Sequence, residues 1–307
     1  MANNNPRLFG GVEGGGTKFI CAVGTEEGEI LAETRIPTTS PDETLSQAII
    51  FFKEQTGNLG ALSAIGIASF GPLDPRPASV KFGHILPTTK PGWTDADIIG
   101  PFQEAFPVPI GFDTDVNGAA LGEWRWGAAQ GLDTFIYLTI GTGIGGGGLV
   151  NGELMHGLLH PEMGHIPLPQ DKVRDPFESV CPFHGDCLEG LASGPAIEKR
   201  WGEKAENLSA GHPAWEMEAS YIAMALRSFI CTLSPERIVL GGGVMQQLHL
   251  LPLIRQKTQE TLNGYVKSAQ ILEQIDDYIV PVALEGKAGI LGAFVIAEKA
   301  LIESKNS

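Results

Sequence analysis

Residues 135–148 read Phe-Ile-Tyr-Leu-Thr-Ile-Gly-Thr-Gly-Ile-Gly-Gly-Gly-Gly, an apolar run of β-forming residues that leads into a series of glycines. Residues 149–150 are again apolar, and an Asn-Gly turn at 151–152 leads into residues 153–155. This pattern predicts a strand, a glycine loop, a strand, a tight turn and a further strand.

The beginning of the chain has the same order of signals. Strands are expected at residues 8–13, 19–23 and 28–36, and Gly14–Gly16 form the glycine loop between the first two. The loops at Gly14 and Gly141 start about 127 residues apart, a spacing that is too long for a solenoid repeat and indicates duplicated domains.

Helical signals alternate with the remaining strand signals. A capping box at residues 40–43 starts one helix, and further helices are expected at 115–126, 222–233 and 289–299. Further strands are expected at 64–70, 108–112, 237–240 and 278–284. Strands that alternate with helices indicate an α/β fold, with a hinge expected near residues 113–118.

Composition excludes several classes of protein. The chain of 307 residues carries 36 acidic and 21 basic residues, and its net charge of −15 argues against a nucleic-acid binder. The N-terminus lacks the apolar run of a signal peptide, and no membrane span is found. Four cysteines are too few for a disulfide scaffold, so we expect a cytoplasmic protein.

Three glycine clusters, Gly14–Gly16, Gly141–Gly148 and Gly241–Gly243, each follow an expected strand. Backbone N–H groups in such loops can bind phosphates, and Lys18 adds a positive charge beside the first loop. The alternative is three ordinary turns, but clusters at equivalent places of a duplicated unit favour phosphate binding. A dinucleotide fingerprint at 141–146 is discounted because a hairpin, rather than a helix, is expected after it.

The segment Asp113-Thr114-Asp115-Val116-Asn117 lies where an expected strand ends and a helix begins. Ligands bind outside the carboxyl ends of strands in α/β sheets, and a carboxylate there can accept a proton from a substrate hydroxyl. The alternative role is a helix N-cap, which is the safer assignment for Asp113 or Asn117. We expect a functional role for Asp115.

A second cluster consists of His165, Cys181, His184 and Cys187. Four nitrogen and sulfur ligands within 23 residues match a closed tetrahedral zinc site, which is structural because no coordination position stays open. The alternatives are a Cys181–Cys187 disulfide, which a cytosolic setting disfavours, and unlinked thiols. Cys21 and Cys231 lie in apolar segments and are expected in the core.

Taken in order along the chain, these motifs resemble those of the ROK family of sugar kinases, and most closely its bacterial fructokinases. Gly11–Lys18 and Leu138–Gly147 resemble the two phosphate loops, and Ile238–Val244 resembles the adenosine loop. Glu162-Met163-Gly164-His165, followed by Cys181 and Cys187-Leu188-Glu189, resembles the family signature and its zinc site.

The resemblance implies an actin-like ATPase fold, in which two duplicated ribonuclease-H-like α/β domains surround a cleft. The N-terminal domain would comprise residues 1–117 and the C-terminal domain residues 118–288. The last helix, 289–307, would pack back on the first domain. A homodimer is the usual expectation.

The resemblance also implies roles for individual residues. Asp115 would be the catalytic base, zinc would be held by the four-residue cluster, and Mg²⁺ would arrive with ATP. The sugar would be bound by Glu162, His165, Glu189 and Asn117. ATP would be bound by Gly15, Gly16, Thr17, Lys18, Thr142, Gly143, Pro195, Gly241, Gly242 and Gly243.

Four positions differ from the pattern of ROK glucokinases, and all four resemble the fructokinase branch: Glu13, Thr114, Pro161 and His184. We therefore expect phosphorylation of D-fructose, with glucose, mannose or N-acetylhexosamine kinases as alternatives. A sugar-binding transcriptional regulator is disfavoured by the acidic charge and by the short segment before the first loop. Trp93 is expected either to close over the sugar or to be a surface aromatic that packs a loop.

Overall fold

The chain divides into two units in the computed structural model, which describes residues 6–306. Unit 1 contains the described residues up to Gln130, the short segment His156–His160 and the described residues from Leu284 onward. Unit 2 contains Gly131–Met155 and Pro161–Ala283. This division places the first boundary after Gln130, whereas the expected boundary at 117/118 falls inside helix α3, Asp115–Trp126.

Unit 1 is built on a five-stranded mixed sheet with the order β3-β2-β1-β4-β5. β1 is antiparallel to β2 and parallel to β4, and β5 is parallel to β4. The strands are β1 Leu8–Gly14, β2 Lys18–Thr25, β3 Ile30–Pro37, β4 Ala64–Ser69 and β5 Ile110–Thr114. In α/β folds, helices pack on both faces of such a sheet.

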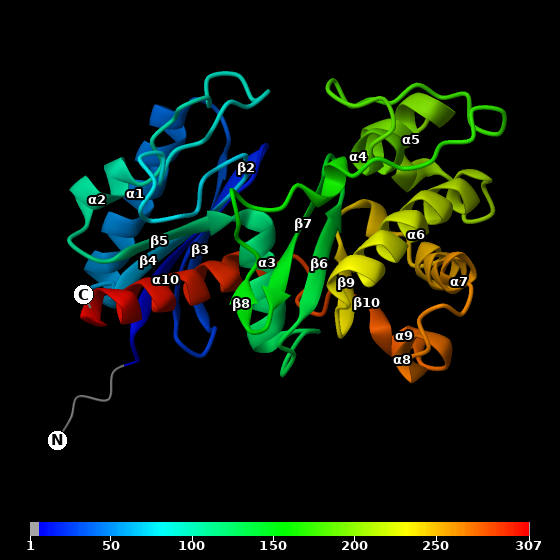
Figure 1. The fold of residues 1–307 in the computed structure, drawn as a ribbon. Helices are drawn as coiled ribbons and strands as arrows, with labels where there is room; N and C mark the ends of the chain where they lie inside the picture. Colours follow the sequence, from blue (N-terminus) through cyan, green and yellow to red (C-terminus); the bar gives the residue numbers. More distant parts are fainter. Residues whose placement is uncertain (1–5, 307) are drawn as a thin grey trace. The chain divides into compact units, whose positions relative to one another are not determined.

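Helices cover both faces of this sheet (Figure 1). On one face, buried side chains of α1, Pro41–Leu59, and α2, Gly100–Ala105, pack with the strands. On the other face α10, Ala288–Asn306, packs against β1, β4, β5 and α3. Ser40 starts α1 because its side chain accepts a hydrogen bond from the Glu43 backbone N–H.

Close helix packing in unit 1 depends on glycine. A Cβ atom at Gly292 of α10 would overlap the carbonyl oxygen of Gly118 in α3, and one at Gly66 of β4 would overlap the carbonyl oxygen of Ala293. These positions let α10 approach both the sheet and α3 more closely than any side chain would permit.

Unit 2 repeats the sheet of unit 1, with the order β10-β9-β6-β7-β8. β6 is antiparallel to β7 and parallel to β9, and β10 is parallel to β9. The strands are β6 Phe135–Ile140, β7 Ile144–Val150, β8 Glu153–Leu154, β9 Arg237–Gly241 and β10 Ile279–Pro281. The expected duplication and the α/β fold class are thus confirmed, including the hairpin after the second glycine loop.

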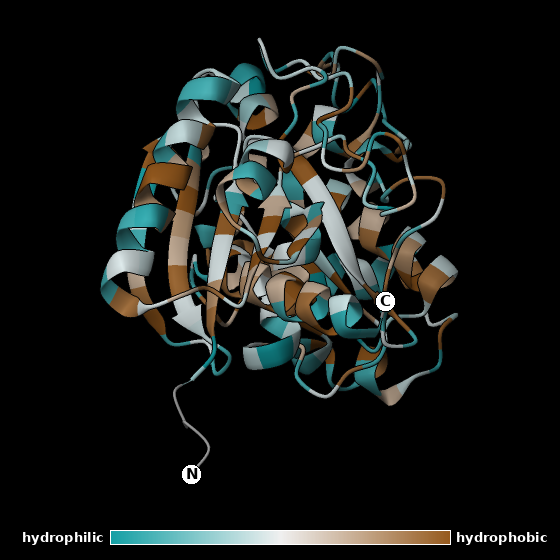
Figure 2. Cartoon of the chain, turned by 90° about the vertical axis from the view of Figure 1, so that its left-hand side faces the viewer, coloured by the Kyte–Doolittle hydropathy of each residue, from teal (hydrophilic) through white to brown (hydrophobic). Residues whose placement is uncertain are grey.

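The helices of unit 2 share one apolar core with its sheet. Buried side chains of β6, β9, α6 and α7 form a continuous cluster. The helices are α4 Leu188–Ala192, α5 Gly194–Trp201, α6 Ala214–Leu233, α7 Leu250–Leu262, α8 Ala269–Leu272 and α9 Ile275–Tyr278. The short 3-10 helices are η1 Met163–His165, η2 Ala205–Asn207 and η3 Val244–Gln246. In Figure 2 many strand residues are apolar, whereas the outer helices alternate polar and apolar residues.

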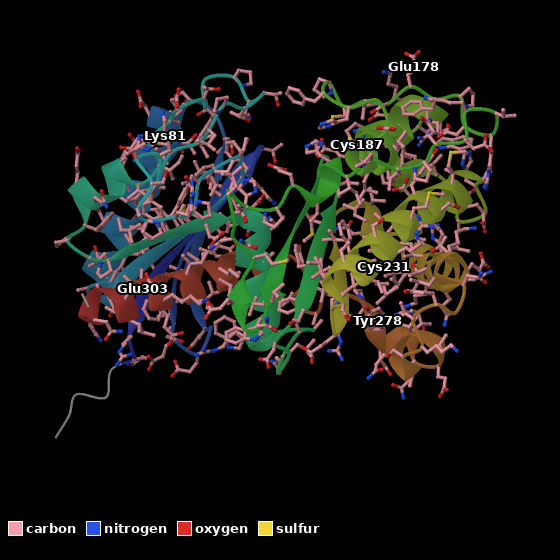
Figure 3. All side chains as sticks on the ribbon, viewed as in Figure 1. Lys81, Glu178, Cys187, Cys231, Tyr278 and Glu303 are labelled. Atoms are coloured by element: carbon pink, nitrogen blue, oxygen red, sulfur yellow. The ribbon has the colours of Figure 1, made fainter. Side chains whose placement is uncertain are left out.

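Two expectations about individual side chains are wrong. Trp93 is neither a lid nor a surface aromatic: it is fully buried between Phe19 and Phe70, and its indole N–H donates to the carbonyl of Thr39. Cys21 is buried as expected, but Cys231 is exposed on α6 (Figure 3), because its helix turns that position away from the core. Among residues 6–306, no helix has both the length and the apolar character that a membrane crossing requires.

Candidate functional site

The carboxyl ends of three parallel strands meet at one edge of the unit 1 sheet. In the strand register Gly14 of β1 is paired with Ser69 of β4, and Ser69 is paired with Thr114 of β5. The first glycine loop and the start of α3 therefore leave the sheet at the same edge, where α/β folds bind ligands.

The first glycine loop is a tight turn that closes on itself. The backbone N–H of Gly15 donates to the carbonyl of Lys18 at 2.9 Å, and the Thr38 hydroxyl donates to the carbonyl of Gly15 at 2.7 Å. The ammonium of Lys90 donates to the carbonyl of Gly16. Lys18 is exposed, so the loop presents backbone and a cation to solvent, as a phosphate site requires.

Glu13 lies at the end of β1, directly before this loop. The backbone N–H of Ile290, in the first turn of α10, donates to its carboxylate, and a Cβ atom at Gly289 would collide with that carboxylate. Burial raises the pKa of Glu13 to about 7, and the nearby Asp115 carboxylate adds to the rise. Oε2 of Glu13 is buried without a hydrogen-bond partner among the described residues.

Asp115 occupies the first turn of α3. Thr114 caps the helix, because its hydroxyl accepts from the backbone N–H of Asn117 at 3.1 Å. Oδ1 of Asp115 accepts from the backbone N–H of Val116 at 2.9 Å. The start of α3 therefore leaves β5 at the same sheet edge at which the first glycine loop leaves β1.

Asn117 has a different environment from the one expected of a sugar ligand. Its side chain is fully buried, and its amide Nδ2 donates to Oδ1 of Asp113 at 2.8 Å. The amide of Asn117 joins the end of β5 to the start of α3, and a sugar contact of Asn117 stays a prediction.

Unit 2 brings together the other residues of the expected nucleotide site. The backbone N–H of Gly194, which begins α5, donates to the carbonyl of Gly141 at 2.7 Å. Gly141 also lies beside Gly243, whose backbone nitrogen is 3.6 Å from the position of a Cβ at 141. Thr142, Gly143 and Pro195 are exposed around this junction. Gly242 has a positive φ of 93°, which glycine adopts without strain.

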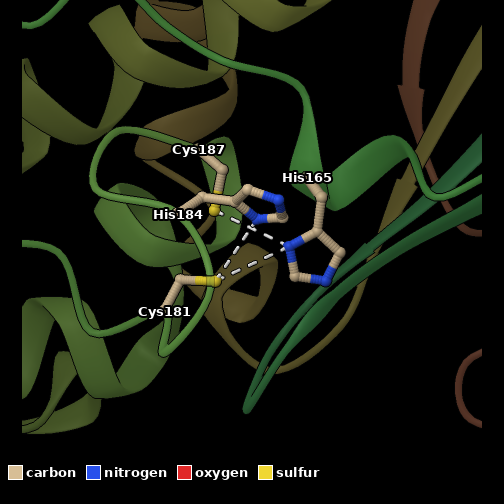
Figure 4. A group of neighbouring side chains, drawn as sticks. All are labelled: His165, Cys181, His184 and Cys187. Carbon is tan, nitrogen blue, oxygen red and sulfur yellow. Dashed lines mark hydrogen bonds between the residues drawn. The ribbon is translucent and has the colours of Figure 1, made fainter.

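The His–Cys cluster is assembled within unit 2 (Figure 4). The ligand atoms of His165, Cys181, His184 and Cys187 all lie within 4.8 Å of one another. Sγ of Cys181 is 3.8 Å from Nδ1 of His165 and 3.6 Å from Nδ1 of His184, and Sγ of Cys187 is 3.7 Å from Nδ1 of His165. All four cysteines of the chain are free thiols, so the alternative disulfide is not formed.

These separations fit a tetrahedral ion. Zn–S bonds of about 2.3 Å and Zn–N bonds of about 2.0–2.1 Å, at a tetrahedral angle, place sulfur and nitrogen about 3.6 Å apart. Burial raises the pKa of the Cys187 thiol to about 11, so a bound cation must displace its proton. The cluster predicted from spacing is confirmed as a group that can hold a metal ion.

His165 and Glu189 connect this cluster to the second glycine loop. Nε2 of His165 is 3.9 Å from Oε1 of Glu189, and Oε2 of Glu189 accepts from the backbone N–H of Ile144 at 2.9 Å. Glu162 precedes η1 and is exposed, and its carbonyl accepts from the backbone N–H of His165. Unit 2 thus brings together all three remaining residues expected to bind the sugar.

The model of the ROK family matches residues 9–300 of this chain. The chain belongs to the ROK family. This ROK protein is 48% identical to a protein of Bacillus subtilis (strain 168) over 96% of each chain. It is 46% identical to a fructokinase of Zymomonas mobilis, over 96% of this chain and 97% of that one. Its fold matches a ROK hexokinase structure from Thermus thermophilus with a TM-score of 0.80, at 28% identity, over 98% of this chain and 100% of that one.

Two residues of this ROK protein were not singled out by sequence reasoning as parts of the site. His156 contacts Asp113, which lies 43 positions earlier in the chain, so no local spacing pattern joins them. Glu13 stands out in the sequence only as a departure from the pattern of ROK glucokinases. The signal that could have found it is a carboxylate placed between an apolar strand and a glycine loop, where few carboxylates are expected.

Proposed function

We propose that this protein is an ATP-dependent fructokinase, which transfers the γ-phosphoryl group of Mg-ATP to the 6-hydroxyl of D-fructose. The observation that carries the proposal is the 46% identity to the Zymomonas mobilis fructokinase over nearly the whole of both chains. The chemistry needs a base, phosphate-binding loops and buried sugar contacts, and the chain has candidates for each.

Asp115 is the general base. It stands at the carboxyl end of β5 and in the first turn of α3, at the sheet edge where the first glycine loop leaves β1. A carboxylate in this position accepts the proton of the sugar hydroxyl as the new P–O bond forms. The hydrogen bond from the Val116 N–H fixes the orientation of the carboxylate relative to the helix.

The glycine loops hold the nucleotide. In unit 1, Gly15, Gly16, Thr17 and Lys18 form the loop that faces the terminal phosphates, and the exposed Lys18 adds a cation. In unit 2, the phosphates, ribose and adenine contact Thr142, Gly143, Pro195 and Gly241–Gly243, which surround the junction of Gly141 with Gly194. Mg²⁺ enters with ATP and neutralises phosphate charge.

The sugar is held by Glu162, His165 and Glu189. Carboxylates that accept hydrogen bonds from sugar hydroxyls reject an analogue that leaves such a group unpaired. Zn²⁺ bound by His165, Cys181, His184 and Cys187 would fix the rotamer of His165 and the path of the loop between these residues. Its role is structural, because four protein ligands fill a tetrahedral shell.

The test is a coupled ADP-release assay with Mg-ATP against fructose, glucose, mannose and N-acetylmannosamine. We expect the highest kcat/KM on fructose, and the Asp115→Asn variant should lose at least about 10²-fold in kcat while retaining ATP and sugar binding. Higher kcat/KM on glucose or mannose would replace the substrate assignment. No turnover on any of the four sugars, from folded and metal-loaded protein, would reject the kinase assignment.

We further propose a homodimer that works in the cytoplasm, where ATP is available. Closed two-fold dimers are the commonest assembly of soluble proteins. Light scattering of the eluting peak in size-exclusion chromatography gives the mass, and a mass of one chain at micromolar concentration would reject the dimer.

A further inference from the structure

A buried carboxylate stands directly behind the start of α3. Asp113, the penultimate residue of β5, is 4% exposed. Its Oδ1 accepts from the backbone N–H of Thr114 at 2.7 Å and from Nδ2 of Asn117 at 2.8 Å. Its Oδ2 lies 2.9 Å from Nε2 of His156. The Thr114 hydroxyl is a fourth, longer donor to Oδ1 at 3.5 Å, so four donors converge on one buried carboxylate.

His156 comes from a distant part of the sequence. It begins the segment His156–His160, which belongs to unit 1 although the residues on both sides of it belong to unit 2. Its Nε2 is also 3.3 Å from Nδ2 of Asn117, so the three side chains form one contiguous cluster. A carboxylate oxygen only accepts, and Nε2 of His156 must therefore carry the hydrogen.

The cluster fixes the backbone that carries Asp115. The Asp113 carboxylate accepts a hydrogen bond from the backbone N–H of Thr114. The Thr114 hydroxyl accepts one from the backbone N–H of Asn117 and so caps the helix. The Asn117 amide then returns to Asp113 and closes a ring of contacts around the first turn. Asp115 lies inside this ring, between Thr114 and Asn117.

We propose that His156 is a positioning residue for Asp115, which it orients through the Asp113–Asn117 cluster at the start of α3. The inference rests on the proposed function, because it assigns a role toward the base of that reaction. His156 stabilises the buried charge of Asp113, and a fully satisfied Asp113 holds the first turn of α3 in one geometry.

The acceptor of this pair is buried more deeply than its donor. The His156 side chain is 31% exposed, whereas the Asp113 side chain is 6% exposed. Truncation of His156 leaves the buried carboxylate of Asp113 without the donor that faces its Oδ2. The anion can recover a partner only if it moves or admits water, and either change shifts the turn that carries Asp115.

The experiment compares His156→Ala with His156→Gln in the fructose kinase assay. The alanine variant should lose about tenfold or more in kcat, because small displacements of a catalytic group cost one to two orders of magnitude. The KM for fructose and for ATP should change less than about twofold. His156→Gln, whose amide can donate to Asp113, should recover most of the kcat. A fall in fructose affinity with unchanged kcat would instead make His156 a sugar contact and overturn the proposal.

A second background tests whether His156 acts through Asp115. In Asp115→Asn protein, His156→Ala should change the residual rate less than about twofold, because the group that it positions has been removed. An equal loss in both backgrounds would overturn the proposal. Wild-type turnover with no effect of His156→Ala rejects this inference alone, whereas absence of wild-type turnover on every sugar rejects the proposed function.

Discussion

Glu189 on α4 accepts the backbone N–H of Ile144 at 2.9 Å, and so fixes the end of the second glycine loop. The other oxygen of the same carboxylate faces His165, whose Nδ1 points into the metal cluster. One side chain therefore joins the loop proposed for phosphate binding to the residues proposed for sugar binding. Substitutions at Glu189 can separate these two tasks.

Glu189→Gln should weaken sugar binding and leave nucleotide binding intact. The amide oxygen can still accept from Ile144, but the charged acceptor for sugar hydroxyls is lost. Hydrogen bonds to charged groups contribute about 1.5–3 kcal/mol, so the KM for fructose should rise about 10- to 100-fold while the KM for ATP stays within about twofold. Glu189→Ala removes both interactions and should raise both KM values. An unchanged KM for fructose in the glutamine variant would contradict the assignment.

Removal of the metal should destabilise the fold of unit 2 before it changes the chemistry. Metal analysis of purified protein should give one zinc per chain, and chelation should lower the Tm by about 5–10 °C, because the site holds residues 165–187 together. Cys181→Ser should lose the metal and show the same fall in Tm.

Cys231 provides the matched control for this substitution. It is exposed on α6 and lies outside the cluster, so Cys231→Ser should keep one zinc and a wild-type Tm. Full metal content in the Cys181→Ser protein would contradict the proposed ligand set.

Gly292→Ala should be strongly destabilising. A methyl group there meets the carbonyl oxygen of Gly118, and backbone cannot move aside as a flexible side chain can. We expect a loss of about 3 kcal/mol or more in the free energy of unfolding. Gly57→Ala is the control: it lies in α1 with open space around its Cβ position, and should stabilise by about 0.5–1 kcal/mol. Urea denaturation of both variants measures the difference, and equal stabilities would contradict the close packing.

Glu218 should make the stability of the protein decline as the pH rises. Its carboxyl group is fully buried in α6, and neither oxygen has a hydrogen-bond partner among the described residues. Burial raises its pKa well above the ordinary value, an effect that Arg200 reduces. The unfolded chain releases this proton above about pH 4.3, whereas the folded chain retains it. The free energy of unfolding is therefore highest below about pH 4.3 and falls as the pH rises from there toward the raised pKa.

Glu218→Gln should therefore raise the Tm at pH 8, and its advantage over the wild type should shrink as the pH is lowered toward 4. Glu216→Gln is the matched control on the same helix, since Glu216 is half exposed and paired with Lys257. A pH-independent difference between wild type and Glu218→Gln would show that the carboxyl group does not titrate as described.

Sequence reasoning predicted those parts of the fold that local patterns determine. Gly141–Gly148 between two apolar runs predicted a hairpin because a turn and alternating β-formers are adjacent in the chain. The metal cluster was predictable for the same reason, since Cys181, His184 and Cys187 are neighbours in one loop. The start of α3 at Asp115 followed from the polar residues at the end of an apolar strand.

Contacts between distant segments could not be predicted in this way. The burial of Trp93 depends on Phe19 and Phe70, which come from other elements of unit 1. Asn117 is a residue type that can bind a sugar hydroxyl, and only the fold shows that its amide donates to Asp113. His156 reaches its partner across 43 positions, and a single histidine carries no periodicity from which that contact could be inferred.

The packing of α10 has a consequence for how the protein is made. Phe9, Ile20 and Ala64 are synthesised early, yet the residues that bury them, Ile290 and Phe294, belong to the last helix of the chain. A growing polypeptide on the ribosome must therefore carry an uncovered face of its first sheet while all of unit 2 is translated. The apolar core of unit 2 consists of residues between 136 and 279, so this core can form during synthesis before α10 has been made.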